Sequence, residues 1–185
     1  SEMCIRDSLN RHINNLREKY GVPAVVSINQ FVADTDAEVE LVMEHCKALG
    51  VQVALSSHWA NGGAGATDLA HMVAEICDAD TTPANTPHKS FVYPNEFSLW
   101  EKLEAVATKV YHASEITAST KVRDRLKELT DGGYGHLPVC IAKTPYSFST
   151  DPALKGAPDA HVMDIREMRL SVGAGFVVAL CGDVM

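Results

Sequence analysis

The stretch Pro23–Leu55, PAVVSINQFVADTDAEVELVMEHCKALGVQVAL, decides the fold of the front of this chain. Pro23–Ile28 is a short apolar run rich in β-branched residues, which predicts a buried strand. Val51–Leu55 is a second run of this kind, and apolar residues recur at helical spacing between the two. A strand, a helix and a strand joined by short links predict a right-handed βαβ unit with parallel strands.

Local signals mark both ends of the central helix. Thr35 and Glu38 form a capping box, in which the Thr35 side chain accepts from the N–H of residue 38 while Glu38 reaches back. Gly50 follows the last apolar position and predicts the helix end. The apolar residues between these ends lie on one side of the helix: Val39, Val42, Met43, Cys46 and Leu49.

The rest of the chain alternates helix and strand patterns. The expected helices are Asn10–Tyr20, Thr67 to about Cys77, Ser98–Val110 with a Ser98/Glu101 capping box, and Ser119–Asp131. The expected loops are Ser56–Ala66 and Asp78–Ser90, and the expected strands are Leu137–Ala142 and two within His161–Leu180. We therefore predict an α/β fold, with a mostly parallel sheet flanked by helices in residues 9–80 and a mixed α+β portion in residues 81–185.

Composition excludes several functional classes. The chain of 185 residues has a formal net charge of −8 and no basic run, which argues against a nucleic-acid-binding surface. No apolar run approaches the roughly 18 residues that a membrane helix needs, and no signal peptide is visible. The five cysteines and eight histidines lack metal-ligand spacing, which predicts reduced thiols and no metal site. These features are typical of a cytoplasmic enzyme or subunit.

The two ends of the sequence stand out. Ser1–Ser8, SEMCIRDS, shares no pattern with the remainder of the chain, and we interpret it as a non-native leader. The other end, VVALCGDVM, stops just after a strong strand pattern. We therefore expect a piece of a longer protein, truncated at both ends.

Two aromatic residues come after the predicted parallel strands. Phe31 comes after the first strand, which ends near Asn29, and Trp59 comes after the second. Because ligands bind beyond the carboxyl ends of parallel strands, both rings are expected on one rim, where they could clamp a flat heterocycle. The alternative is that both rings simply cover the end of the core.

Asn29, at the end of the first strand, and two polar segments are further candidates for substrate or nucleotide contacts. Backbone N–H groups of Gly62 and Gly63, in NGGAGAT, could hold an anion at a helix start, although such a turn can also be only a turn. Lys143, Thr144 and Tyr146 come after a predicted strand and could reach a ligand, or could form a solvated connection. The chain contains neither G-x-x-x-x-G-K-[ST] nor G-x-G-x-x-G.

Four motifs in order resemble the formate–tetrahydrofolate ligase family, also called formyltetrahydrofolate synthetase. They are GVPAVVSINQFVADTDAEVELV, ALSSHWANGGAGATDLA, GYGHLPVCIAKTPYS and REMRLSVGAGFVVALCGDVM, and together they extend the resemblance from Leu9 to Met185. The resemblance implies a part of a P-loop-NTPase-like core. It also implies that Phe31 and Trp59 sandwich the ring system of the folate.

The resemblance further implies a reaction in which ATP phosphorylates formate and N10 of tetrahydrofolate attacks the formyl phosphate. ATP with Mg²⁺, a monovalent cation and a homotetramer are then expected. The phosphate-binding loop with its lysine would lie upstream of Leu9, so we expect no catalytic residue in this chain and no ligase activity from it alone. Two alternatives stay open: a non-catalytic folate- or nucleotide-binding module, and a plain α/β interaction domain.

Overall fold

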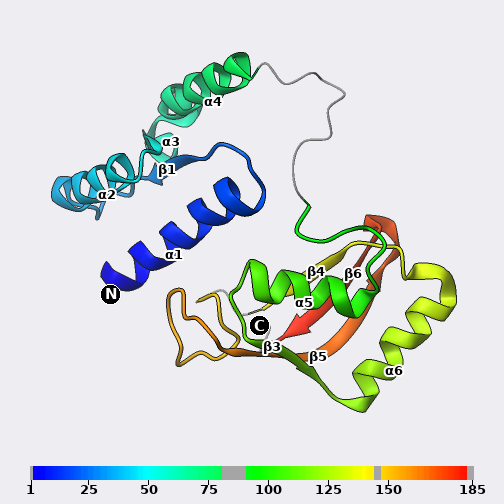
Figure 1. Ribbon diagram of the computed structural model, residues 1–185. Coiled ribbons are helices and arrows are strands. Elements are labelled where there is room, and N and C mark those ends of the chain that lie inside the picture. The colour runs from blue at the N-terminus through cyan, green and yellow to red at the C-terminus, as the bar shows by residue number, and fades with distance from the viewer. Residues whose placement is uncertain (1, 81–90, 144–146, 183–185) are drawn as a thin grey trace. The chain divides into compact units, whose positions relative to one another are not determined.

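The computed structural model describes residues 2–80, 91–143 and 147–182, and the chain forms two compact units. One unit comprises Val22–His88, and the other combines Ser1–Gly21 with Lys89–Met185. Each unit has a sheet of its own (Figure 1). Among the described residues, none of the helices combines the length and the apolar character that a membrane-spanning segment requires.

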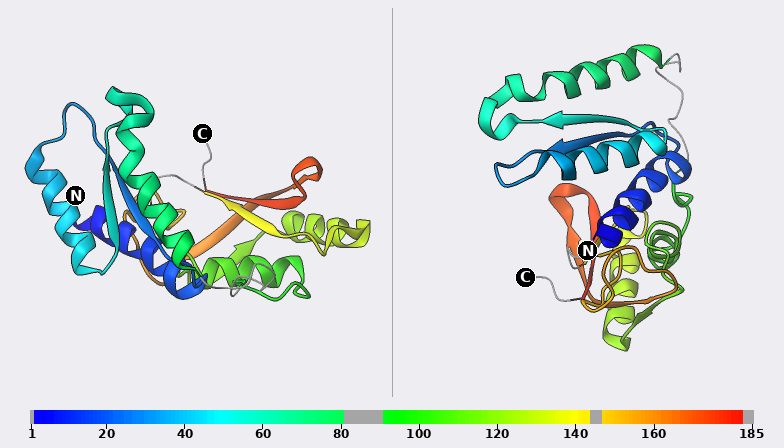
Figure 2. Two further views of the ribbon diagram at one scale, coloured as in Figure 1. Left: turned by 90° about the horizontal axis from the view of Figure 1, so that it is seen from above. Right: turned by 90° about the vertical axis from the view of Figure 1, so that its left-hand side faces the viewer.

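The unit Val22–His88 is the predicted βαβ arrangement. Strands β1 and β2 pair in parallel, with Val25 opposite Gln52 and Asn29 opposite Ser56. Helices α2 and α4 lie on opposite faces of this strand pair (Figure 2). The elements in order are β1 Val25–Asn29, α2 Asp36–Ala48, β2 Gln52–Ser56, α3 His58–Asn61, the 3₁₀ turn η2 Gly62–Ala66 and α4 Thr67–Ala79.

The end signals of α2 act as the sequence predicts. Both hydrogen bonds of the capping box between Thr35 and Glu38 are present. Gly50 has a φ of 66°, a left-handed conformation that glycine adopts without strain. Val39 and Cys46 are buried on the inner side of the helix. The prediction of one loop over Ser56–Ala66 was wrong, because α3 and η2 continue the chain as short helical turns.

The second unit contains a mixed four-stranded sheet in the order β3-β5-β6-β4. The pairs β3/β5 and β4/β6 are parallel, whereas β5 and β6 form an antiparallel hairpin. Helices α5 and α6 cover one face of this sheet (Figures 1 and 2). The elements are α1 Glu2–Asn14, the π-helical turn η1 Asn15–Lys19, α5 Leu99–Lys109, β3 Glu115–Ala118, α6 Thr120–Leu129, the π-helical turn η3 Thr130–Tyr134, β4 Val139–Ala142, β5 Val162–Ser171, the 3₁₀ turn η4 Val172–Ala174 and β6 Phe176–Cys181.

Inward-facing residues of this sheet pack against α5 and α6. On β6, alternate residues Val177, Ala179 and Cys181 are buried. On β5, the pairing register shifts between Ile165 and Glu167, so that the next buried residue is Met168. This bulge keeps both halves of the long strand in contact with the core. Leu99, Leu103, Val122 and Leu126 supply the helix side of that core.

Two features of this unit differ from the sequence prediction. The first helix begins at Glu2 instead of Asn10, since neither Pro nor Gly interrupts the intervening residues. It contacts the rest of the unit through an Arg11 Nη2–Asp159 Oδ1 pair at 2.9 Å, and Asn15 Nδ2 donates to the Val110 carbonyl at 3.0 Å. Strand β3 was not predicted, because its four residues carry too short a pattern. The larger P-loop-type core implied by the resemblance stays a prediction.

A buried lysine connects α5 to the segment before β4. Lys102 is 1% exposed, and its ammonium donates to the carbonyl oxygens of Gly135, His136 and Leu137 at 3.1, 3.2 and 3.1 Å. Burial lowers the pKa of this ammonium, whereas the charge of Glu96 raises it. The three carbonyls compensate the lost hydration, so Lys102 fixes the turn that leads into β4.

Candidate functional site

Phe31 and Trp59 lie on the same rim of the β1/β2 sheet. Phe31 comes after the end of β1, and Trp59 lies in α3 directly after β2. The two strands end together because they are parallel, and a hydrogen bond from Gln30 N to the Ser56 carbonyl at 3.0 Å extends their pairing by one residue. The prediction from strand order therefore placed these two residues on one rim correctly.

The two rings are exposed and close to each other. Phe31 is 50% exposed and Trp59 is 73% exposed. Their centroids are 6.2 Å apart and their planes are inclined by 51°. The two rings therefore form an exposed aromatic pair, and both alternatives, a ligand clamp and a cover for the end of the core, stay open. A flat ring between two parallel aromatic faces needs a centroid separation of about 7–8 Å, so the pair must rotate and separate slightly to enclose one.

A tight turn holds Phe31 at this rim. The Phe31 backbone N–H donates to Asp34 Oδ2 at 2.8 Å, and the Asp34 backbone N–H donates to the Phe31 carbonyl at 3.0 Å. Such Asp-stabilised turns are favoured in loops because the carboxylate replaces a backbone acceptor. The sequence analysis missed Asp34, although an Asp three residues after Phe31 is a signal for this turn.

The backbone of Ser57 holds Trp59 through the start of α3. The Ser57 carbonyl accepts from the backbone N–H groups of Ala60 and Asn61 at 3.1 and 3.0 Å. Its hydroxyl accepts from Asn61 Nδ2 at 2.9 Å, and its N–H donates to the Gly65 carbonyl at 3.0 Å. The position of Trp59 is therefore determined by a network of short-range hydrogen bonds on the surface.

Comparison with known proteins identifies the family of this chain. Residues 6–185 match the family described as formate–tetrahydrofolate ligase. The formate–tetrahydrofolate ligase of Granulibacter bethesdensis is 52% identical over 181 residues. That of Methylococcus capsulatus is 52% identical over 179 residues, and that of Pelagibacter ubique 48% over 178 residues. The chain belongs to the formate–tetrahydrofolate ligase family.

The chain matches only a part of these ligases. The three alignments cover 96% of this chain but 30% or 31% of each relative. This chain thus spans less than a third of the length of the formate–tetrahydrofolate ligases that it resembles. The family match confirms the identification made from the four motifs.

The other residues near the rim stay candidates for ligand contacts in this ligase family. Asn29 is exposed at the end of β1. Gly62 and Gly63 are exposed in η2, which directly precedes α4. Gly62 has a φ of 56°, a left-handed conformation that suits glycine. The structure therefore keeps Asn29, Gly62 and Gly63 in the same unit as the aromatic pair.

Lys143 belongs to the other unit, directly after β4. Its ammonium donates to the Ser147 carbonyl and lies 5.6 Å from the ring centroid of Tyr111. Burial lowers the pKa of this ammonium, and the nearby Cys181 raises it. Thr144 and Tyr146, predicted with Lys143, lie outside the described residues. Lys143 is thus a partly buried cation beside an aromatic side chain.

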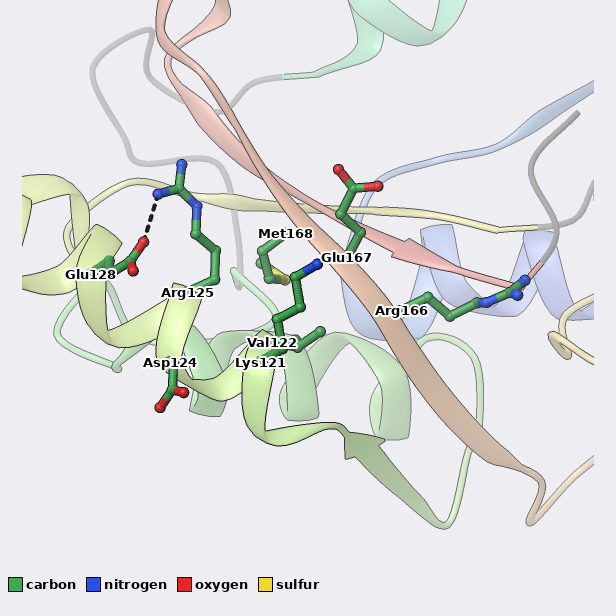
Figure 3. A pocket seen from close by; sticks show the side chains of 8 residues that line it. All are labelled: Lys121, Val122, Asp124, Arg125, Glu128, Arg166, Glu167 and Met168. Carbon is green, nitrogen blue, oxygen red and sulfur yellow. Dashed lines mark hydrogen bonds and ion pairs between the residues drawn. The ribbon is translucent and has the colours of Figure 1, made fainter.

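A groove of about 660 Å³ lies between α6 and β5 in the same unit (Figure 3). Charges of both signs line it, and the Arg125 guanidinium pairs with Glu128 at 2.9 Å. Arg166, at the bulge of β5, points away from that pair (Figure 3). The lining residues are Lys121, Val122, Asp124, Arg125, Glu128, Arg166, Glu167 and Met168. This balance of charges is typical of a solvated face, and we assign the groove no ligand.

Proposed function

We propose that the unit Val22–His88 binds the ring system of tetrahydrofolate between Phe31 and Trp59. The observation that carries this proposal is the pair of exposed rings, 6.2 Å apart, at the carboxyl ends of two parallel strands. The reaction of the whole ligase would be ATP-dependent formation of 10-formyltetrahydrofolate from formate through formyl phosphate. This chain supplies the folate side of that reaction.

The physical argument for the clamp is the gain from covering two exposed aromatic faces. A heterocycle between the rings removes one face of Phe31 and one face of Trp59 from water, and stacking on an aromatic side chain contributes about 1–3 kcal/mol per contact. The tilt of 51° must then decrease. Side-chain rotation on the surface can provide this change, because neither ring is enclosed by neighbours.

The phosphate chemistry has no built site among the described residues. They contain no cluster of three or more His, Cys, Asp or Glu that could hold a metal ion. The sequence also lacks the phosphate-loop lysine motif. We therefore assign the described residues no step in phosphoryl transfer. The monovalent cation, the homotetramer and the cytoplasmic location belong to the proposal for the whole ligase.

A fluorescence titration tests the proposal. In a Trp100→Phe background, Trp59 is the only tryptophan of the chain. Adding a reduced folate to this protein should quench the emission saturably, because the ligand stacks on the indole. Folded protein that shows no saturable change would refute the proposed folate site. Saturable quenching by adenine nucleotides with no response to folate would favour a nucleotide-binding module instead.

A further inference from the structure

Gly65 and Ser57 approach each other too closely for any side chain at position 65. A Cβ atom built on Gly65 would lie 2.5 Å from the Ser57 carbonyl carbon, 2.7 Å from its oxygen and 2.7 Å from the His58 nitrogen. Real Cβ atoms do not make such contacts with backbone atoms. The same Cβ at Gly62 or Gly63 would meet nothing within 4 Å. Of these three glycines, Gly65 alone is required by contact.

This contact closes a short surface loop on itself. The Ser57 N–H donates to the Gly65 carbonyl at 3.0 Å, which joins the start of α3 to the end of η2. The Ser57 carbonyl begins α3 by accepting from Ala60 and Asn61. Trp59 lies in the sequence between Ser57 and its partners Ala60 and Asn61. Any displacement of Ser57 and His58 therefore moves the backbone of Trp59 as well.

The closed loop contributes little to the core of the unit. Neither α3 nor η2 contains a buried residue. The consequence of the Gly65–Ser57 contact is therefore the placement of residues 57–61 and not the burial of apolar surface.

We propose that Gly65 is a positioning residue for Trp59. The absence of a side chain lets the turn Gly62–Ala66 close against Ser57, which fixes α3 and places the indole of Trp59 beside Phe31. Any effect of Gly65 on folate binding rests on the proposed function, whereas its effect on the position of Trp59 does not. A methyl group at residue 65 would push Ser57 and His58 away or open the turn.

The first test compares two Gly→Ala variants in the Trp100→Phe background. Gly65→Ala should change the emission maximum of Trp59 and its quenching by acrylamide, and should weaken binding of a reduced folate about tenfold. Gly173→Ala is the matched control, because its Cβ meets nothing within 4 Å in the hairpin of the other unit. The control should change none of these three properties. A folded Gly65→Ala protein with the parent's emission, quenching and affinity would overturn the inference.

A double-mutant cycle shows whether Gly65 acts through Trp59. Adding Gly65→Ala to Trp59→Ala should weaken folate binding no further, because the residue that it positions is already gone. If the double variant loses as much folate affinity as the two single variants together, the inference is contradicted. If the parent protein binds no folate, the proposed function fails, and the emission and quenching measurements still decide the role of Gly65.

If Gly65→Ala does not fold, Asn61→Ala tests the same inference with a smaller change to the loop. Asn61→Ala removes the 2.9 Å bond to the Ser57 hydroxyl on the exposed side of the same loop. It should shift acrylamide quenching of Trp59 in the same direction by a smaller amount. Unchanged quenching in that variant would show that the Asn61 side-chain bond to Ser57 does not hold Trp59.

Discussion

The ring centroids of Phe31 and Trp59 lie 6.2 Å apart, with their planes inclined by 51°. Both rings stand at the end of a parallel strand pair, and hydrogen-bonded turns hold their backbones. Phe31 is 50% exposed and Trp59 is 73% exposed, and under the proposed function a flat ligand stacks on both rings. The affinity of the ligand should therefore depend on both rings and on the turns that hold them.

Trp59→Ala should weaken binding of a reduced folate by about 1–3 kcal/mol, the value of stacking on one aromatic face. Isothermal titration calorimetry measures this loss without relying on tryptophan emission. Trp100→Phe is the control, since Trp100 lies in α5 of the other unit with the Arg123 guanidinium 4.2 Å from its ring centroid. Unchanged affinity in Trp59→Ala would make Trp59 a residue that only covers the sheet end.

Asp34→Ala should weaken folate binding by about 1 kcal/mol, because the Phe31 N–H loses its 2.8 Å bond to Asp34. Asp34→Asn keeps a side-chain oxygen that can accept this bond, so it should lose less affinity. Calorimetry on both variants gives the comparison. Equal losses of folate affinity in Asp34→Ala and Asp34→Asn would mean that the carboxylate charge, and not the turn, determines the affinity.

Lys102→Met should lower the free energy of unfolding of its unit by about 1–3 kcal/mol. The substitution leaves the carbonyls of Gly135, His136 and Leu137 without their buried donor. Lys127→Met, at an exposed position of α6, should change stability by no more than about 0.5 kcal/mol. Urea unfolding followed by far-UV circular dichroism measures both. Equal free energies of unfolding of Lys102→Met and Lys127→Met would contradict the conclusion that Lys102 stabilises the turn before β4.

His161→Phe should leave stability at neutral pH unchanged or raise it by about 1 kcal/mol. His161 is 7% exposed, and neither ring nitrogen makes a well-aligned hydrogen bond within the described residues. A phenyl ring of similar size removes these poorly bonded nitrogens. A clear loss of stability at pH 7 would show that the imidazole makes a contribution that its contacts do not explain.

The same variant should also flatten the pH dependence of stability. Burial lowers the pKa of His161 below 6.5; Lys143 and Arg11 act in the same direction, and the Pro158 backbone and Asp159 oppose it. The unfolded chain then binds the proton at higher pH than the folded chain, so His161 causes stability to fall as pH drops from 6.5 toward the lowered pKa. Urea midpoints of His161→Phe should fall less over this range than those of the parent protein.

Local patterns predicted much of the fold and the shared rim of Phe31 and Trp59. The βαβ unit, both capping boxes and the terminal hairpin depend on residues that are near in sequence, so their signals are visible without tertiary information. The shared rim of Phe31 and Trp59 is a consequence of parallel strand direction alone. These predictions needed only periodicity, cap residues and strand topology.

Features that depend on tertiary contacts could not be predicted in the same way. Strand β3 is four residues long and is defined by its pairing with β5. The burial of Lys102 depends on three carbonyls more than thirty residues away in sequence. The tilt of 51° between the rings of Phe31 and Trp59 depends on their side-chain conformations in the folded protein. Spacing in the sequence does not specify the pairing of β3, the carbonyl partners of Lys102 or the tilt of the two rings.

A structure of this chain with a bound reduced folate tests the central claim most directly. We predict the pterin ring between Phe31 and Trp59, with the two side chains nearly parallel and their centroids about 7–8 Å apart. A folate bound elsewhere, with the two rings still in contact at their present tilt, would contradict the claim.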